Sequence, residues 1–279
     1  MISKETTPVL TPFQALAKYR DELTLQLANG PLVVLPGVIG TVFFERGSKP
    51  DVRQGILDCF DRFELMFGKH LQGGKDADLG KFTKRRPKGV ENIRRAIIET
   101  VPYREVSVVR SSATNQDTAA EYEIKTLTNV EMGDDYKLPG SGYVMKKGSD
   151  FGNLSYIKFN IPLEHITDDE GLVQYEDFLR FMCQRLPVRG GYGGYSSILP
   201  YSFHRFTPQE YALAERFSGL EIDSFAFMEK NNYLTRSYSG KSQELATDFY
   251  PYLFPGAKVQ EYGFIKSVNW YTLAWRCVR

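Results

Sequence analysis

The sequence has few of the residues that build disulfides, metal centres or nucleophilic active sites. Its 279 residues include only three cysteines, which lie far apart: Cys59, Cys183 and Cys277. This odd number, without a CxxC pair, excludes a disulfide framework and a cysteine metal centre. The histidines are equally scattered, and none lies beside a nucleophile or within a ligand set: His70, His165 and His204. We therefore predict no metal, no cofactor and no enzymatic activity.

The sequence also lacks an excess of charge and a long hydrophobic run. Its 35 Lys and Arg residues nearly balance 34 Asp and Glu residues, which leaves a formal net charge of +1. No global basic field can attract nucleic acid or an anionic membrane, so electrostatic recognition must be local. The opening residues, MISKETTPVLTPFQ, contain no apolar signal segment, and no run is long enough to cross a bilayer. We expect the protein in the reducing cytosol.

Apolar residues are plentiful enough for a packed core. Hydrophobic residues make up 42% of the chain and aromatic residues 14%, with Phe and Tyr dominant. Such an aromatic surplus is typical of a Phe- and Tyr-rich core and also of a binding surface. We predict one continuous domain, residues 1–279, which could divide into lobes 1–150 and 151–279.

Four segments have the apolar spacing and end signals of amphipathic helices. In two of them a threonine that can cap the helix precedes a proline, at Thr11 and at Thr207. The predicted helices cover residues 11–28, 48–68, 167–187 and 207–223. Within the third, one face is expected to point inward: Leu172, Tyr175, Leu179, Met182 and Leu186.

Strand patterns lie between these helices. Residues 32–45 read as a strand interrupted at Pro36–Gly37, and residues 104–112 and 121–129 read as an antiparallel pair. In LSYIKFNI the alternation predicts one buried sheet face, formed by Ile157, Phe159 and Ile161. The polar stretches 72–89 and 131–153 read as loops. Because the strands pair locally, we predict an α+β fold with a mixed, largely antiparallel sheet packed with amphipathic helices.

The stretch RLPVRGGYGGYSSILPY, residues 185–201, combines four glycines with three tyrosines. A phosphate-binding loop would open directly into a helix and would carry a lysine, and this stretch does neither. Arg189, Tyr192 and Tyr195 resemble an RGG-like segment that stacks on nucleic acid. Alternatively, the glycines let the chain turn tightly after the preceding helix and approach a neighbour closely.

Two further segments leave other functions open. The basic segment Lys84–Lys88 could grip phosphates together with the Gly/Tyr stretch, or it could be a solvated loop. Glu123 and Lys125 match the carboxylate-x-lysine half of a metal-dependent nuclease site, which also needs a second carboxylate. Only Glu105, at the start of the neighbouring strand, and Asp117, in the turn, are near in sequence. Charges that alternate on an exposed strand face explain the same pattern.

The segment HITDDEG places three acids at the start of a predicted helix: Asp168, Asp169 and Glu170. Acids in a first turn complement the positive end of the helix dipole. An exposed negative cluster could equally steer a basic partner, and nearby tyrosines would then supply buried contact area.

Five sequence blocks, in this order, resemble the type VI secretion immunity family: GVIGTVFFERGSKPDVRQGILDCFDRFELMFGKHLQ, LSYIKFNIPLEHI, LPVRGGYGGYSSILP, ERFSGLEID and IKSVNWYTLAW. The resemblance implies a cytoplasmic antidote that binds a toxin delivered by the type VI apparatus, in some cases a nuclease. It implies no catalytic residues.

From the resemblance and the residues together we expect a non-enzymatic immunity protein. It would bind its cognate type VI effector toxin and cover the active groove, without binding nucleic acid or membrane directly. Tyr192 and Tyr195 are the expected anchors, and Asp168, Asp169 and Glu170 are the expected steering charges. A nucleic-acid-binding module and a metal-dependent nuclease are the alternatives.

Overall fold

The computed structural model describes residues 17–28, 30–75, 82–131, 134–137, 144–147, 150–151, 154–202, 206–216, 259–260 and 264–265. The first residues of the predicted helix 11–28 lie outside this set. Residues 18–23 form turns, and the strand β1 occupies Leu25–Gln26. The prediction of a helix is therefore wrong at its C-terminal end, where Leu25 and Gln26 pair with the next strand.

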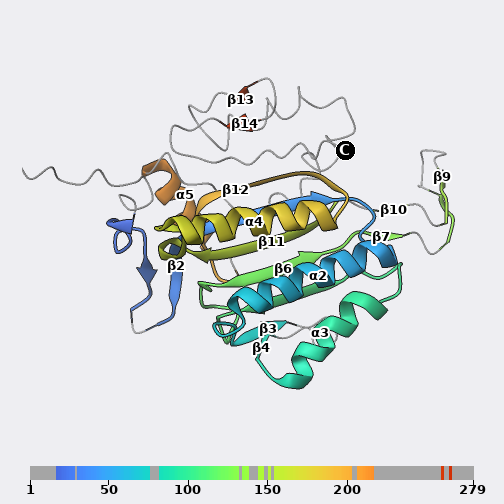
Figure 1. Ribbon diagram of the computed structural model, residues 1–279, viewed down its shortest axis with the longest axis horizontal. Helices are drawn as coiled ribbons and strands as arrows, with labels where there is room; N and C mark the ends of the chain where they lie inside the picture. The colour runs from blue at the N-terminus through green and yellow to red at the C-terminus, as the bar shows by residue number, and fades with distance from the viewer. Residues whose placement is uncertain are drawn as a thin grey trace, which may run out of the picture.

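An antiparallel sheet forms the centre of the molecule (Figure 1). Its strand order is β1-β2-β11-β6-β5-β3-β4, and β12 also pairs with β2. The strands are β2 (Leu32–Phe44), β3 (Gly73–Lys75), β4 (Phe82–Lys84), β5 (Ser107–Ser111), β6 (Glu123–Leu127), β11 (Ser155–Pro162) and β12 (Val188–Ile198). Together with the helices, this sheet confirms the predicted α+β class.

Strand β2 runs without a break through Pro36–Gly37, so the predicted interruption is wrong. Its ladder with β11 ends at Gly37, which pairs with Pro162. The missing N–H of Pro36 therefore removes no hydrogen bond from that ladder. On the other edge, Pro36 pairs with Ser197 of β12.

Three helices cover one face of the sheet: α2 (Pro50–Phe67), α3 (Pro87–Glu99) and α4 (Asp169–Arg185) (Figure 1). A short 3-10 helix, Leu163–Ile166, precedes α4, and α5 spans Thr207–Arg216. The helices predicted at 48–68 and 167–187 are confirmed as α2 and α4, and α5 confirms the start of the fourth. Apolar residues from α2, α4 and the sheet form one core, with Phe63, Phe159 and Phe178 in mutual ring contact.

The predicted loop 72–89 instead contains β3, β4 and the first turn of α3. Helix α3 buries only three side chains, those of Ile93, Ala96 and Ile97. Its first residues are polar or small, so the sequence there resembles a loop. The second predicted loop, 131–153, contains short strands: β7 (Val130–Glu131) pairs with β10 (Asp150–Phe151), and β8 (Tyr136–Lys137) pairs with β9 (Val144–Met145). A further short pair joins β13 (Val259–Gln260) and β14 (Phe264–Ile265).

Strands β5 and β6 form the predicted antiparallel pair, from Ser107 opposite Leu127 to Ser111 opposite Glu123. In β11, Ile157, Phe159 and Ile161 lie in the core as predicted. The residues that alternate with them are also buried, with Lys158 9% and Asn160 3% exposed. The sheet is therefore buried on both faces here.

The Gly/Tyr stretch is not a turn, because residues 188–198 form strand β12 along β2. The close approach expected of its glycines is confirmed at Gly193. A Cβ atom there would lie 2.5 Å from Tyr175 Oη and 2.8 Å from the Ile39 carbonyl oxygen. Tyr175 Oη donates a hydrogen bond of 2.7 Å to that same carbonyl, so α4 contacts the sheet backbone at this point.

Gly193→Ala should lower the free energy of unfolding by about 1–3 kcal/mol, because the added methyl group displaces Tyr175 from Ile39. Gly89→Ala is the matched control, since a Cβ at Gly89, in the first turn of α3, meets nothing within 4 Å. It should leave stability unchanged or raise it by up to about 1 kcal/mol. Urea unfolding measures both, and equal effects of the two substitutions would contradict the close packing at Gly193.

Candidate functional site

One residue of the acidic segment at the start of α4 has a structural role. Asp168 is the N-cap, and its Oδ1 accepts a hydrogen bond of 2.7 Å from the Gly171 backbone N–H. Asp169 and Glu170 lie exposed in the first turn, where their charges also favour the helix dipole. Glu170 Oε1 accepts from Gln174 Nε2 at 3.2 Å. Asp169 and Glu170 therefore lie at the surface and do not cap the helix.

The two expected tyrosine anchors differ in their surroundings. Tyr195 pairs with Val38 and lies in the main core with 5% of its surface exposed. Burial raises the pKa of its phenol. In this conformation Tyr195 therefore supports β12 from within and is not presented to a partner. Tyr192 pairs with Thr41, and the side chains of Arg189 and Tyr192 lie outside the described part of the structure.

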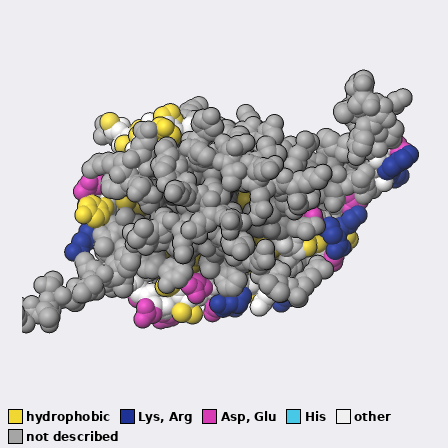
Figure 2. All heavy atoms as spheres, turned by 90° about the horizontal axis from the view of Figure 1, so that it is seen from above, with side chains coloured by type: hydrophobic (Ala, Val, Ile, Leu, Met, Phe, Trp, Pro, Cys, Tyr) yellow, Lys and Arg dark blue, Asp and Glu magenta, His cyan; other side chains and the backbone are white. Residues whose placement is uncertain are grey.

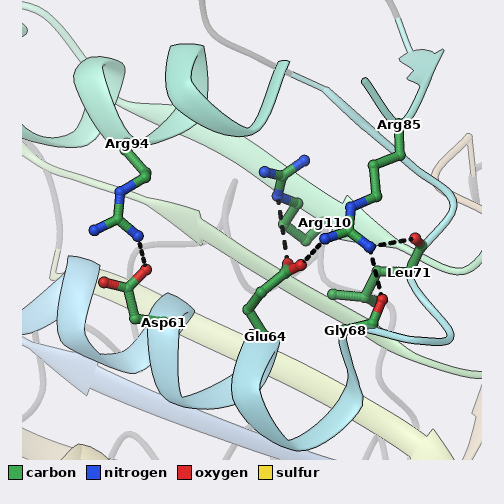
Figure 3. A network of polar contacts seen from close by, with 7 residues as sticks. All are labelled: Asp61, Glu64, Gly68, Leu71, Arg85, Arg94 and Arg110. Carbon is green, nitrogen blue, oxygen red and sulfur yellow. Dashed lines mark hydrogen bonds and ion pairs between the residues drawn. The ribbon is translucent and has the colours of Figure 1, made fainter. Parts of the chain in front are cut away.

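The basic segment Lys84–Lys88 is exposed, as expected of a solvated segment, but it joins the end of β4 to the start of α3, and Arg85 within it contacts the end of α2 (Figure 3). Arg85 Nη1 donates to the backbone oxygens of Gly68 at 2.8 Å and Leu71 at 3.4 Å. The same guanidinium pairs with Glu64, which also lies 4.0 Å from the buried Arg110 of β5. The last carbonyl groups of a helix need hydrogen-bond donors from outside the helix. Arg85 donates such bonds here, so its guanidinium is bound within the fold.

A second ion pair in Figure 3 joins α3 to α2. Arg94 of α3 pairs with Asp61 of α2. The Arg94–Asp61 pair and the contacts of Arg85 hold the polar segment 82–99 against α2. These contacts explain why that segment is ordered although it buries few apolar side chains.

Glu123 and Lys125 do not lie on an exposed strand face. Their side chains are only 8% and 12% exposed, and Glu123 Oε1 lies 3.5 Å from Lys125 Nζ. Lys158 stands directly opposite Lys125 on β11. The other carboxylate near this cluster is Glu210, which comes from α5 rather than from a neighbouring strand. Asp117 lies elsewhere and accepts a hydrogen bond of 2.6 Å from Ser202 Oγ.

Burial dominates the electrostatics of this cluster. It raises the pKa of Glu210 to about 8, and the positive charge of Lys158 acts in the opposite direction. Burial lowers the pKa of Lys158, Lys125 lowers it further, and Glu123 and Glu210 oppose this change. Sequence reasoning missed this site because alternation along β6 and β11 indicated one exposed face. Within the described ranges, no group of three His, Cys, Asp or Glu residues could hold a metal ion.

The outer surface of the described residues is mixed in character. Seen from above, Lys and Arg side chains are interspersed with Asp and Glu side chains along its visible rim (Figure 2). Large apolar side chains are exposed on different helices, with Leu65 of α2 76%, Val173 of α4 54% and Ile98 of α3 41% exposed. No helix among the described residues is long and apolar enough to span a membrane.

Comparison with known proteins identifies the family. The TsiV family model, described as type VI immunity for VRR-NUC, matches residues 55–240, which include most of α2, all of α3 to α5 and the sheet strands from β3 to β12, but not β1 and β2. The chain belongs to this family. The resemblance expected from the sequence is thereby confirmed, and the protein is a type VI immunity protein by family.

A solved structure has the same fold. A Pseudomonas aeruginosa type VI secretion system protein, PA0821, superposes with a TM-score of 0.60 at 18% sequence identity. The match covers 78% of this immunity protein and 59% of the Pseudomonas chain, so it spans less than two thirds of that relative. A search of curated proteins found no match.

The geometry at the start of α4 predicts different effects for adjacent acids. Asp168→Ala should lower the free energy of unfolding by about 1 kcal/mol, because the Gly171 N–H loses its acceptor. Asp169→Ala should cost at most about 0.5 kcal/mol, since it removes only an exposed charge near the helix dipole. Urea unfolding at low salt compares them. A larger loss for Asp169→Ala would mean that Asp168 does not cap α4.

Proposed function

We propose that this immunity protein binds a VRR-NUC nuclease delivered by a type VI secretion apparatus and covers the groove in which that nuclease cuts nucleic acid. The family match over residues 55–240 carries the proposal. Protection of this kind requires a complementary surface and no reaction centre. A standard-size interface of about 1,600 Å² in total would suffice if a few residues are well-packed anchors.

Charge complementarity supports a nuclease as the partner. A groove that binds a polyanion is lined with Lys and Arg, and exposed carboxylates on an inhibitor attract such a groove during diffusional encounter. All three acids are exposed, but Asp168 also accepts the capping hydrogen bond of α4. We assign the steering role mainly to Asp169 and Glu170. Tyr192 remains the proposed anchor on β12, and Tyr195 would act by holding that strand in place.

The test begins with the open reading frames next to the gene. A neighbouring frame that encodes a VRR-NUC-like domain should kill cells when expressed alone and should not kill them when this protein is co-expressed. The two products should co-purify through size exclusion at physiological salt. Equal killing with and without this protein, from a nuclease that is expressed and active, would refute the proposal.

Removal of the steering charges should slow association without loosening the bound complex. Asp169→Asn combined with Glu170→Gln should lower the association rate constant by about threefold or more, and the difference should shrink as salt rises. Surface plasmon resonance with the purified nuclease measures both rates.

Glu91→Gln combined with Glu99→Gln is the matched control, because it removes two exposed acids from α3. The control should bind at the wild-type rate. Equal rates for both double variants would remove the start of α4 from the interface. In the same experiment Tyr192→Ala should speed dissociation, and an unchanged dissociation rate would remove Tyr192 as an anchor.

A further inference from the structure

Exposed apolar side chains gather where α3 ends. Of the eight large hydrophobic side chains that are exposed among the described residues, three lie within six positions: Ile98, Val101 and Tyr103. Tyr103, at 59%, is the most exposed of the aromatic residues in that set, and Pro102 beside it is exposed as well. Single exposed apolar residues are ordinary, but a cluster of them marks a contact site.

The backbone that carries this cluster is fixed by hydrogen bonds. The carbonyl oxygens of residues 100–102 each accept one. In chain order the donors are the guanidinium of Arg53, the backbone N–H of Arg104 at 3.0 Å and the backbone N–H of Glu131 at 3.0 Å. Arg53 belongs to α2 and is 2% exposed, so one of these donors comes from within the fold. We call residues 98–103 the α3 turn.

Glu131, which supports the α3 turn, is itself held at the start of α2. Its carboxylate accepts a hydrogen bond of 2.6 Å from Ser48 Oγ and pairs with Lys49 Nζ at 2.8 Å. Ser48 and Lys49 directly precede α2. The α3 turn is therefore tied to α2 from two sides. A loop that is already ordered before it binds loses little conformational entropy in the complex, so its contacts are worth more.

The α3 turn lies at one end of the helical layer formed by α2, α3 and α4. These helices lie side by side with α2 in the middle, and the end of α3 is beside the start of α2 (Figure 1). Leu65 of α2 and Val173 of α4 are also exposed, so five of the eight exposed large hydrophobic side chains belong to this layer or its turn. The start of α4, with Asp169 and Glu170, is part of the same layer.

The charges around the α3 turn balance. Arg95 and Glu99 precede its apolar residues and Arg104 and Glu105 follow them, and all four are exposed. A surface without net positive charge does not suit a polyanion or an anionic membrane. An apolar centre with charges of both signs around it is instead the composition of a protein–protein contact.

We propose that the α3 turn is a further anchor for the nuclease, with Tyr103 as its main contact; this inference rests on the proposed function. The acids at the start of α4 act during encounter, whereas the apolar turn acts after docking and slows dissociation. Tyrosines that become fully desolvated in a contact are frequent hot spots. The layer thus presents steering charges and an ordered apolar anchor to the same partner.

Surface plasmon resonance with the purified nuclease domain tests the anchor on the full chain. Tyr103→Ala should raise the dissociation rate constant about tenfold or more and leave the association rate constant within about twofold of wild type. Ile98→Ser combined with Val101→Ser should also speed dissociation. Tyr103→Phe should stay within about threefold of wild type, because the ring supplies the contact. All of these positions are exposed, so urea unfolding should show a midpoint close to wild type.

Tyr211→Ala is the matched control, because it removes a similarly exposed tyrosine from α5, which is not one of the three helices of the layer. It should dissociate at the wild-type rate. A wild-type dissociation rate for both Tyr103→Ala and the Ile98/Val101 double variant would overturn the anchor while leaving the proposed function in place. Dimerisation of the wild-type protein that Tyr103→Ala abolishes would also overturn it, since the turn would then contact a second copy. Absence of binding by the wild-type protein would refute the proposed function itself, and the anchor with it.

Discussion

The fold depends on the hydrogen-bonded pairing of β2 along both of its edges. Strand β11 pairs with it from Gly37 to Phe44, and β12 pairs along the opposite edge from Leu35 to Phe44. This ladder sets the register that carries Phe159 into the core and Lys158 to the other face. It also places the Ile39 carbonyl where Tyr175 of α4 donates to it. The helical layer and the buried charge cluster both follow from that register.

The central strands are buried on both faces of the sheet, so the exposed side chains of the described residues lie mainly outside these strands. The outer sides of the helices and the start of α4 carry exposed charged and apolar side chains, of which Asp169, Glu170 and Leu65 are examples. A mixed surface of this kind suits recognition of one folded protein better than nonspecific binding of a polyanion, which needs a broad basic area. Membership of the type VI immunity family and this surface together support an antidote that acts by covering a nuclease.

Elements with a strong local signal could be predicted from the sequence. The apolar stripes of α2 and α4 and the hairpin of β5 and β6 need no distant partner to be recognised. The errors arose where distant contacts decide the structure. Residues 82–99 are ordered through ion pairs such as Arg85 with Glu64 and Arg94 with Asp61, and the glycines of β12 are extended because they pair with β2. Burial of Lys158 was missed because its counter-charge, Glu210, lies 52 residues further along the chain (210 minus 158) on a different element.

The most direct test of the central claim is a titration of nuclease activity at a nuclease concentration far above the dissociation constant. Increasing amounts of this protein should reduce cleavage linearly to zero at an equimolar ratio, because each molecule covers one active groove. Prior saturation of the nuclease with an uncleavable DNA should slow the inhibition. Complete inhibition by a small substoichiometric amount would show that the protein acts catalytically on the toxin or its substrate, and would contradict the account.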